Sequence, residues 1–374
     1  MNWYLFAHAP HLLLYYINMK DNTESNIALY RKYRPENWNE VIGQDHIVKA
    51  ISGALEAGKV AHAYLLCGPR GTGKTTIARI IARELGTSPN DIYEMDAASN
   101  RGIDDVREIR DNVRTLPFDS KYKIYILDEV HMFTKDAWNA LLKTIEEPPE
   151  HVIFILATTE LEKIPETIVS RCQSFVFKKP NDAILSKVVT NVAKKEGYKL
   201  EEGGAELIAL LADGAFRDAL GTLQKVISFG NDKVINISEI EEITGAPNTT
   251  LVNNFLDALA SNDISKGFNA IEKASNQNIE MNVYIKMILY KLRYALMLRY
   301  VPSTKKSIES SISEEDMTYI TNLISSKPEH ISSATLSILL ESYQSLHNAV
   351  ISELPLELAL VKILNAEKQN KQTE

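Results

Sequence analysis

The chain has few cysteines and no excess of positive charge, and both shortages exclude classes of protein. Its 374 residues include only two cysteines, Cys67 and Cys172. Two cysteines cannot supply a disulfide framework or a four-ligand structural zinc site, so we expect no structural zinc and a reducing, cytoplasmic location. The formal net charge is −8 at pH 7, which disfavours wholesale attraction to nucleic acid. Any DNA contact therefore needs a local basic patch.

A run long enough to span a membrane is also lacking. Residues 1–19 are aromatic, apolar and poor in charge, but Pro10 interrupts them. The run is too short to cross a bilayer, and it has neither the basic flank nor the small-residue cleavage site of a signal peptide. We interpret residues 1–27 as a disordered extension or a mis-assigned start, with Met19 as the real one; an interfacial membrane anchor is the alternative. We expect no membrane partner.

Composition and pattern predict a globular protein of two or three domains. Hydrophobic residues make up 45% of the chain and charged residues 24%, so the chain can bury a large core and is not expected to be disordered. Strand-like runs alternate with helical segments, and these runs lie at 63–67, 91–95, 123–127, 152–157 and 174–177. Such alternation predicts a parallel sheet with helices on both faces.

Beyond residue 181 the pattern is helical. Three short helices are expected at 182–196, 201–213 and 217–228, and a helix-rich segment runs from 249 to about 367. Within that segment, a mostly apolar stripe at helical spacing marks residues 282–300. We expect no further strand and no internal repeat.

A phosphate-binding loop is the most informative motif. The pattern G-x-x-x-x-G-K-[ST] is matched at every required position by Gly68-Pro69-Arg70-Gly71-Thr72-Gly73-Lys74-Thr75. Its glycines let backbone N–H groups turn toward phosphate oxygens, and the helix that follows, from Thr76, points its positive end at the anion. Lys74 supplies positive charge to the β- and γ-phosphates, and Thr75 offers a hydroxyl to Mg²⁺. Because a strand precedes the loop and a helix follows it, a chance glycine-rich turn is disfavoured. The segment predicts binding of ATP with Mg²⁺.

An acidic pair completes the predicted nucleotide site. Residues 124–127 indicate a buried strand that ends in Asp128 and Glu129. At the carboxyl end of a neighbouring parallel strand, Asp128 is expected beside the phosphate loop, where it can hold Mg²⁺. Glu129 is placed to orient and activate a water for attack on the γ-phosphate. An acidic turn after a strand is the alternative, which the spacing from the phosphate loop disfavours. The chain is therefore predicted to hydrolyse, or at least bind, ATP.

Several further motifs recur in the same order as in a known family. Along the chain they are Asp96-Ala97-Ala98-Ser99, Leu127-Asp128-Glu129-Val130-His131-Met132, Ala140-Leu141-Leu142-Lys143-Thr144, Glu146-Glu147-Pro148-Pro149-Glu150 and Ser170-Arg171-Cys172. With these motifs the chain resembles the gamma/tau subunit of the bacterial DNA polymerase III clamp loader, a member of the AAA+ ATPases. The similarity is dense over 28–246, and beyond that it rests on the position and length of the helices.

The resemblance implies a fold class and a domain order. We expect an α/β AAA+ domain with a P-loop and a parallel sheet at 28–180, a small helical lid at 181–246, an all-α collar for oligomerisation at 247–368 and a polar tail at 369–374. It also implies an ATPase that opens a ring-shaped sliding clamp and closes it around primer-template DNA. The expected partners are that clamp, that DNA, and the delta, delta prime and further gamma/tau subunits. A label of DNA polymerase would describe the holoenzyme, because no polymerase active site is visible.

The family motifs assign further residues to the nucleotide site. Tyr33, Val41 and Ile42 lie in the segments that match the family's adenine-side contacts. Thr159 matches sensor 1, a catalytic residue that hydrogen-bonds the attacking water or the γ-phosphate. Arg217 matches sensor 2, a lid cation that reaches the bound phosphates. A strand-end cap is the alternative for Thr159, and a surface charge paired with the next residue is the alternative for Arg217.

Arg171 resembles the family's arginine finger. It follows a helix at the start of the last strand, on the rim of the nucleotide domain, from which it cannot easily fold back onto its own ATP. The resemblance implies a catalytic role in a neighbouring subunit's site, where the guanidinium would stabilise transition-state charge. An exposed arginine in a surface ion pair is the alternative.

A predicted helix at 103–114 is the candidate DNA-binding element. Arg107, Arg110 and Arg114 recur at i, i+3 and i+7, which places them along one face. Such a stripe can track phosphates and bind DNA without sequence preference, and Arg101, just before the helix, is favoured together with Arg107. A solvated helix is the alternative, since acidic residues on the same helix offer local partners. The family commonly carries two basic residues where this chain has Arg101 alone.

Two departures from the family pattern limit what the resemblance implies. Family members usually insert a four-cysteine zinc module after the phosphate-loop helix, whereas here residues 83–89 lead directly to the second strand. The chain is also gamma-like in length, so we do not expect the helicase and polymerase tethering of the longer tau form. An archaeal-type replication factor C small subunit, a branch-migration helicase and a nucleotide-dependent scaffold are the alternative interpretations. The Asp-Glu-Val-His motif at 128–131 speaks against the first, and the intact set of Lys74, Asp128 and Glu129 disfavours the scaffold.

Overall fold

The computed structural model describes residues 27–230, 232–309, 312–325 and 328–370. Two compact units make up the chain: the first runs to Leu185 and includes Ala212–Gln224, and the second comprises Ser186–Leu211 and the chain from Lys225 onward. The segment that we interpret as an extension or a mis-assigned start lies, except for residue 27, outside the described residues. None of the helices in the described ranges is long and apolar enough to cross a membrane.

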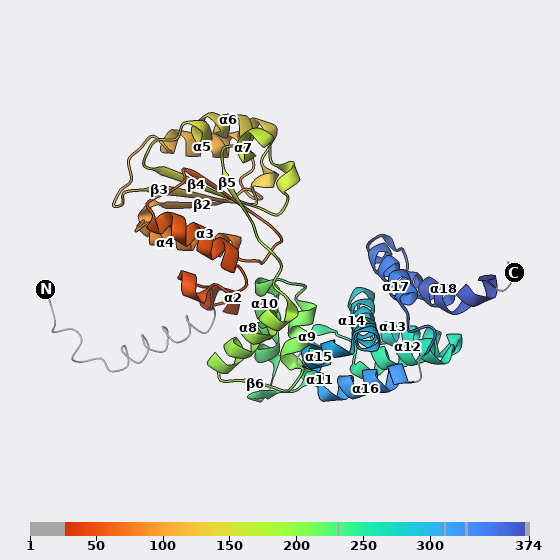
Figure 1. Cartoon of the computed structure of the whole chain (residues 1–374). Helices are drawn as coiled ribbons and strands as arrows, with labels where there is room; N and C mark the ends of the chain where they lie inside the picture. Colours follow the sequence, from red (N-terminus) through yellow and green to blue (C-terminus); the bar gives the residue numbers. More distant parts are fainter. Residues whose placement is uncertain (1–26, 231, 310–311, 326–327, 371–374) are drawn as a thin grey trace, which may run out of the picture. The chain divides into compact units, whose positions relative to one another are not determined.

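A five-stranded parallel sheet forms the centre of the first unit (Figure 1). Its strands are β1 (Ala63–Cys67), β2 (Ile92–Asp96), β3 (Lys123–Asp128), β4 (Val152–Thr158) and β5 (Gln173–Val176). All five predicted strands are confirmed, with ends that differ by no more than one residue. The strand order is β2-β3-β4-β1-β5, so β4 separates the strand before the phosphate loop from the strand that ends in the acidic pair.

Helices cover both faces of this sheet, as the alternation of strands and helices predicts (Figure 1). One face packs against α3 (Asp45–Glu56) and α4 (Lys74–Glu84), and the other packs against α5 (Ile103–Asn112), α6 (Lys135–Glu146) and α7 (Glu166–Val169). Shorter helical segments of this unit are α2 (Leu29–Lys32), η2 (Trp38–Glu40), η3 (Pro89–Asp91), η4 (Val130–Met132) and η5 (Leu161–Lys163).

Strand β1 shows how the core is divided between these two faces. Its five residues are all buried. Ala63, Leu65 and Cys67 join the cluster that includes residues of α5, α6 and α7, while Tyr64 and Leu66 join the cluster that includes residues of α3 and α4. Alternate residues of a strand point to opposite faces, so a continuous apolar run is required where both faces are covered. The burial of β1 holds the phosphate loop, which follows it directly, on a rigid base.

Beyond residue 181 the chain is mostly helical, but the expectation that strands stop there is wrong. The elements are α8 (Asp182–Lys195), β6 (Lys199–Leu200), α9 (Gly204–Leu211), α10 (Phe216–Phe229), β7 (Val234–Ile235) and α11 (Ile237–Thr244). β6 and β7 pair in parallel as a separate two-stranded sheet. Strands of two residues are too short to show an alternating pattern, so the sequence does not predict them. The helix predicted at 217–228 is confirmed as α10.

The remaining helices belong to the second unit. They are α12 (Thr249–Ser261), α13 (Ile264–Asn276), α14 (Met281–Tyr300), η6 (Pro302–Thr304), α15 (Lys305–Glu309), α16 (Glu314–Ser325), α17 (Ser333–Ser345), η7 (Leu346–Asn348) and α18 (Leu354–Asn370). The long α14 contacts α12, α16 and α17, and the apolar stripe predicted for it is buried. A buried lysine ties part of this unit together, since Lys291 Nζ donates to Asp316 at 2.6 Å and to the side-chain oxygen of Asn253 at 2.9 Å.

Candidate nucleotide-binding and hydrolysis site

The phosphate loop lies between β1 and α4, as predicted, and its glycines are required by its surroundings. Gly68 has a φ of +145°, and a Cβ there would lie 2.6 Å from the carbonyl oxygen of Phe177. Gly71 has a φ of +74°, and its Cβ would lie 2.8 Å from the Cβ of Ala215, just before α10. The backbone of the loop therefore packs closely between the end of the sheet and the start of α10, a fit that only glycine permits.

Lys74 is held inside this loop. Its side chain is buried, and its ammonium donates to the carbonyl oxygens of Gly68 at 2.8 Å and Pro69 at 3.0 Å. Burial lowers the pKa of Lys74, although the nearby carboxylates of Glu129 and Asp128 oppose that change. A bound phosphate would offer this ammonium a fully charged acceptor in place of two neutral carbonyls. The lysine is thus placed for the phosphate contact that the motif predicts.

The two predicted Mg²⁺ ligands contact one another. The hydroxyl of Thr75 donates to Asp128 Oδ2 at 2.6 Å. The prediction that Asp128 ends a strand next to the phosphate-loop strand is wrong, because β4 lies between β3 and β1. The two residues still meet, since the carboxyl ends of parallel strands share one edge of the sheet. A hydroxyl and a carboxylate fit Mg²⁺, which takes only one or two protein ligands and completes its shell with phosphate and water.

Within the residues that the structure describes, no group of three or more His, Cys, Asp or Glu side chains could hold a metal ion. Both cysteines are free thiols: Cys67 is buried at the end of β1, and Cys172 is half-buried before β5. Burial raises the pKa of Cys67 to about 11 and that of Cys172 to about 12. Both groups are therefore protonated, and poor metal ligands, near neutral pH.

Glu129 and Thr159, the predicted hydrolysis pair, meet in the structure. Glu129 has a left-handed backbone, with φ +50°, and its carboxylate accepts a hydrogen bond from the Thr159 hydroxyl at 3.2 Å. The capping role that was the alternative for Thr159 belongs to its neighbour, because the Thr158 hydroxyl accepts from the backbone N–H of Glu160 at 3.0 Å. Thr159 therefore has its hydroxyl beside the carboxylate expected to activate water.

Arg217 lies at the second position of α10, and its guanidinium contacts the ring of Tyr30, 5.4 Å from the ring centre. Within the described part of the chain, the alternative ion pair with Asp218 is not formed. The positive charge of Arg217 lowers the pKa of Lys74 and contributes to a lowered pKa of Arg34, which burial causes first. Cations thus gather near the phosphate loop, where an anion would relieve their mutual repulsion.

The adenine-side segment is held in place by Gln44, its last residue. Gln44 is fully buried; its amide donates to Lys178 O at 2.8 Å and accepts from Lys178 N at 3.3 Å. Tyr33 is half-buried, and Val41 packs against the core of the sheet. Ile42 is 47% exposed, so it offers an apolar surface that a base could cover. The adenine-side role of these three residues stays a prediction.

Arg171 forms the surface ion pair that was the alternative to an arginine finger. Its guanidinium pairs with Glu146 at the end of α6 and donates to the Thr167 carbonyl at 2.7 Å and to Ser170 Oγ at 3.2 Å. All these partners lie in the same chain, on or next to α6 and α7. The side chain remains 36% exposed, so a neighbouring subunit could still reach it.

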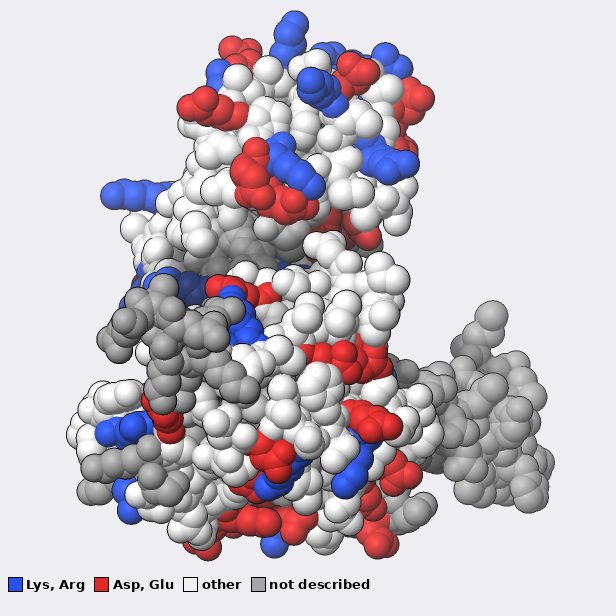
Figure 2. All heavy atoms as spheres, turned by 90° about the vertical axis from the view of Figure 1, so that its right-hand side faces the viewer, with Lys and Arg blue, Asp and Glu red and all other residues white. Residues whose placement is uncertain are grey.

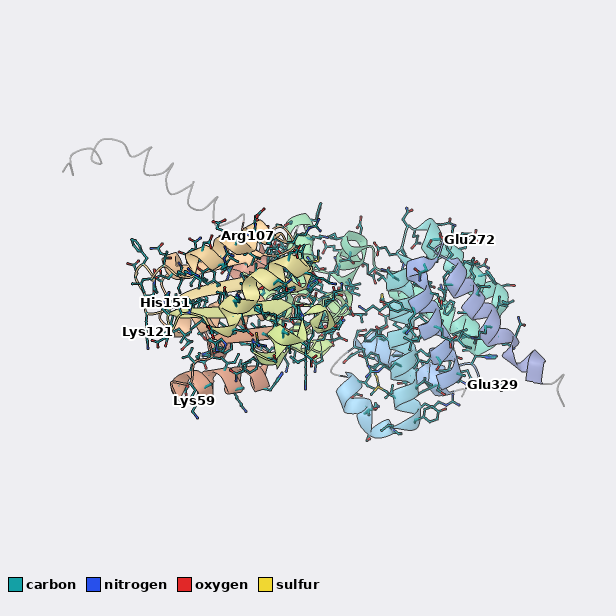
Figure 3. All side chains as sticks on the ribbon, turned by 90° about the horizontal axis from the view of Figure 1, so that it is seen from above. Lys59, Arg107, Lys121, His151, Glu272 and Glu329 are labelled. Carbon is teal, nitrogen blue, oxygen red and sulfur yellow. The ribbon has the colours of Figure 1, made fainter. Side chains whose placement is uncertain are left out.

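The candidate DNA-binding helix is shorter than predicted, because α5 ends at Asn112 and Arg114 lies in the turn beyond it. Arg107 pairs with Asp104 at 2.9 Å, and Arg110 pairs with Asp111 at 3.0 Å. Figure 3 shows Arg107 on the outer side of this helix, and Figure 2 shows basic and acidic side chains interspersed on the face that it draws. Arg107 and Arg110 are therefore paired with acidic residues of the same helix, which was the alternative to DNA binding. These ion pairs are exposed, so DNA phosphates could replace them.

Comparisons with known proteins identify relatives of this chain. A family model described as DNA polymerase III, delta subunit, matches residues 86–181, and one described as DNA polymerase III subunits gamma and tau domain III matches residues 235–374. DNA polymerase III subunit gamma of Buchnera aphidicola subsp. Baizongia pistaciae is 39% identical over 300 residues, which cover 74% of this chain and 80% of that protein. The chain belongs to the DNA polymerase III gamma/tau subunit family. The resemblance read from its motifs is confirmed.

Longer members of this family extend beyond the chain. DNA polymerase III subunit tau of Bacillus subtilis is 36% identical over 364 residues, which are 92% of this chain but 64% of that protein. For the gamma/tau subunit of Mycoplasma pneumoniae, the match is 38% identical and covers 69% of this chain and 41% of that protein. Among solved structures, a variant of RuvB from Thermotoga maritima is 25% identical, with a TM-score of 0.50, and the match covers 61% of this chain and 79% of that one. That likeness supports the AAA+ fold of the gamma/tau family member described here.

Proposed function

We propose that the chain is an ATP-hydrolysing motor subunit of a DNA polymerase III clamp loader. Membership of the gamma/tau family supports the assignment to a clamp loader. The observation that carries the activity is the meeting of Thr75 with Asp128 and of Glu129 with Thr159 around one phosphate loop. A nucleotide-dependent scaffold would need only the binding half of this arrangement, whereas Glu129 and Thr159 are suited to hydrolysis.

In this proposal each residue has one chemical task. Lys74 exchanges the loop carbonyls for oxygens of the β- and γ-phosphates, and Thr75 and Asp128 hold the metal. Bound Mg²⁺ supplies neutralisation of the phosphate charge. Glu129 takes the proton of a water that attacks the γ-phosphorus as the bond to the β–γ bridging oxygen breaks, and Thr159 orients that water. General bases of this kind contribute about 10²- to 10⁴-fold to the rate.

The wider assembly is also part of the proposal. The chain would act in the cytoplasm with the delta and delta prime subunits and further gamma/tau copies, and it would open a sliding clamp and close it on primer-template DNA. Arg171 would stabilise transition-state charge in the site of a neighbouring subunit, and Arg217, in the lid, would contact the bound phosphates. Arg101, Arg107 and Arg110 would contact DNA phosphates, with a strong dependence on salt.

Reconstitution tests this function directly. The purified chain is combined with the delta and delta prime subunits, and ATP turnover is measured with and without the sliding clamp and primed circular DNA. We expect clamp and primed DNA together to stimulate hydrolysis and the clamp to become linked to the circle. Glu129→Gln should bind ATP but abolish both effects. Turnover that ignores the clamp but responds to branched DNA would instead identify a branch-migration motor.

A further inference from the structure

A chain of polar contacts leads from the candidate hydrolysis site to the protein surface. His131 Nδ1 lies 3.4 Å from Glu129 Oε2, and its other ring nitrogen, Nε2, lies 3.3 Å from Glu160 Oε1. Glu160 in turn forms an ion pair with Lys163 at 2.7 Å. The imidazole thus bridges the carboxylate expected to activate water and a second carboxylate with no assigned role.

The register of the sheet explains why these residues meet. β3 and β4 pair in parallel with Leu127 opposite Leu156. The same offset, continued four residues beyond the Leu127–Leu156 pair, relates His131 to Glu160. Thr159, which contacts Glu129, and Glu160, which contacts His131, are adjacent in the chain. The segment after β4 therefore meets the segment after β3 through two contacts, that of Thr159 with Glu129 and that of Glu160 with His131.

His131 is itself held in place. Its side chain is 8% exposed, and the hydroxyl of the fully buried Thr158 lies 3.2 Å from its Nδ1. On the outer side, the hydrogen bond with Lys163 lowers the pKa of Glu160, so that carboxylate is charged near neutral pH. The imidazole therefore stands between two carboxylates, each close to a different ring nitrogen.

Glu129 needs such support. Its side chain is 28% exposed, and a glutamate has three rotatable side-chain bonds that few contacts restrict here. Like-charge repulsion from Asp128, the preceding residue, would also push its carboxylate away from the metal side. A general base must lie within hydrogen-bond reach of one water in one orientation. The Thr159 hydroxyl alone is a single contact, and it does not determine that orientation.

We propose that His131 is a positioning residue for ATP hydrolysis: by linking Glu129 to Glu160, it holds the Glu129 carboxylate in the direction of the attacking water. The inference rests on the proposed hydrolytic function and adds to it a role for two residues outside the nucleotide contacts. Lys163 anchors the outer end of the link and Thr158 the inner end. No bond to ATP or to the metal is assigned to His131.

The test uses steady-state hydrolysis by the assembly of chain, delta and delta prime, together with equilibrium binding of a fluorescent ATP analogue. His131→Ala should lower kcat about tenfold, part of what a general base contributes, while KM and nucleotide affinity change less than about twofold. His131→Asn keeps an amide nitrogen near the place of Nδ1, and His131→Gln keeps one near Nε2. Asparagine should therefore restore more of kcat than glutamine.

Glu160→Ala tests the link from its exposed end, where no buried space is opened, since Glu160 is 37% exposed. It should lower kcat by about threefold, and the double variant His131→Ala/Glu160→Ala should be no slower than His131→Ala alone, because both changes break one link. His151→Ala is the matched control: the Nε2 atom of this histidine lies 3.2 Å from the carbonyl oxygens of Val113 and Thr115, which belong to neither the phosphate loop nor the acidic pair. Its kcat should equal that of the unmodified chain.

Three results would each overturn the proposal. The first is a kcat for His131→Ala or Glu160→Ala equal to that of the unmodified chain. The second is a fall in kcat that asparagine restores no better than glutamine, which would mark His131 as a packing residue. The third is full additivity in the double variant. Because every comparison can be made on basal hydrolysis without clamp or DNA, a failure of the clamp-loading function would appear separately, as a lack of stimulation in the unmodified chain.

Discussion

Replacing Arg171 by alanine separates a surface ion pair from a residue that acts on a neighbouring subunit, because the two roles predict effects of very different size. In the structure the guanidinium, 36% exposed, contacts Glu146, Thr167 and Ser170. Losing such partly exposed contacts costs about 1 kcal/mol of folding stability. An arginine finger contributes about 10³- to 10⁵-fold to phosphoryl transfer, and at 1.36 kcal/mol per factor of ten the smallest of these losses is about 4 kcal/mol.

The assay measures hydrolysis by the assembly, nucleotide binding by the isolated chain, and thermal unfolding of both. Arg171→Ala should leave nucleotide affinity nearly intact while clamp- and DNA-stimulated hydrolysis falls by about 10³-fold or more. Glu146→Ala is the matched control, because it removes the same ion pair and leaves the arginine. If Arg171 acts on a neighbour, Glu146→Ala should hydrolyse ATP at the normal rate or faster, since the guanidinium is released.

A mixing experiment tests directly whether Arg171 acts on a neighbouring subunit. Subunits with Lys74→Ala keep Arg171 and should restore some hydrolysis to Arg171→Ala subunits when the two assemble together. The in-trans mechanism is wrong if no mixture exceeds the activity of Arg171→Ala alone and that variant has also lost nucleotide binding. Equal and small losses for Arg171→Ala and Glu146→Ala would refute it as well, and would leave the ion pair as the whole role.

Four further outcomes are expected. Lys74→Ala should abolish nucleotide binding by the isolated chain, whereas Glu129→Gln should keep binding and lose turnover, as equilibrium titration and a phosphate-release assay would show. The purified protein should hold no structural zinc; stoichiometric zinc that survives dialysis against a chelator would contradict this. Burial raises the pKa of Cys67 to about 11 and of Cys172 to about 12, so both thiols stay protonated at pH 8 and should react with iodoacetamide far more slowly in the native than in the urea-unfolded protein. Gly267→Ala should destabilise the second unit by about 1–3 kcal/mol in urea titration, because its Cβ would lie 2.5 Å from a side chain of α18; stabilisation, as at an open helical position, would refute that packing.

Much of the fold could be predicted because its signals are local. The inner strands β1, β3 and β4 are short, mostly apolar runs, and their burial requires such runs. The sheet of β6 and β7 carries no such signal, since each strand has two residues. The end of α5 was also misplaced, by two residues, because helical periodicity continues past the last hydrogen-bonded turn.

The candidate site likewise has residues that could be predicted from the sequence and contacts that could not. Lys74, Thr75, Asp128 and Glu129 could be identified from spacing, since a strand, a loop and a helix that follow one another hold their residues at fixed offsets. The partners of His131 could not. Glu160 lies 29 residues further along the chain and meets His131 only because β3 pairs with β4 in one register.

The sequence by itself therefore predicted the nucleotide site, the order along the chain of the strands of the main sheet, and the family, since each rests on residues that are close in the chain or on motifs in a fixed order. The tertiary structure alone decided that β4 lies between β1 and β3, that Arg171 pairs with Glu146, and that an imidazole joins two carboxylates beside the hydrolysis site. The physical reason is that strand order and register bring together residues far apart in the chain, and periodicity within one element contains no information on which other element it will meet.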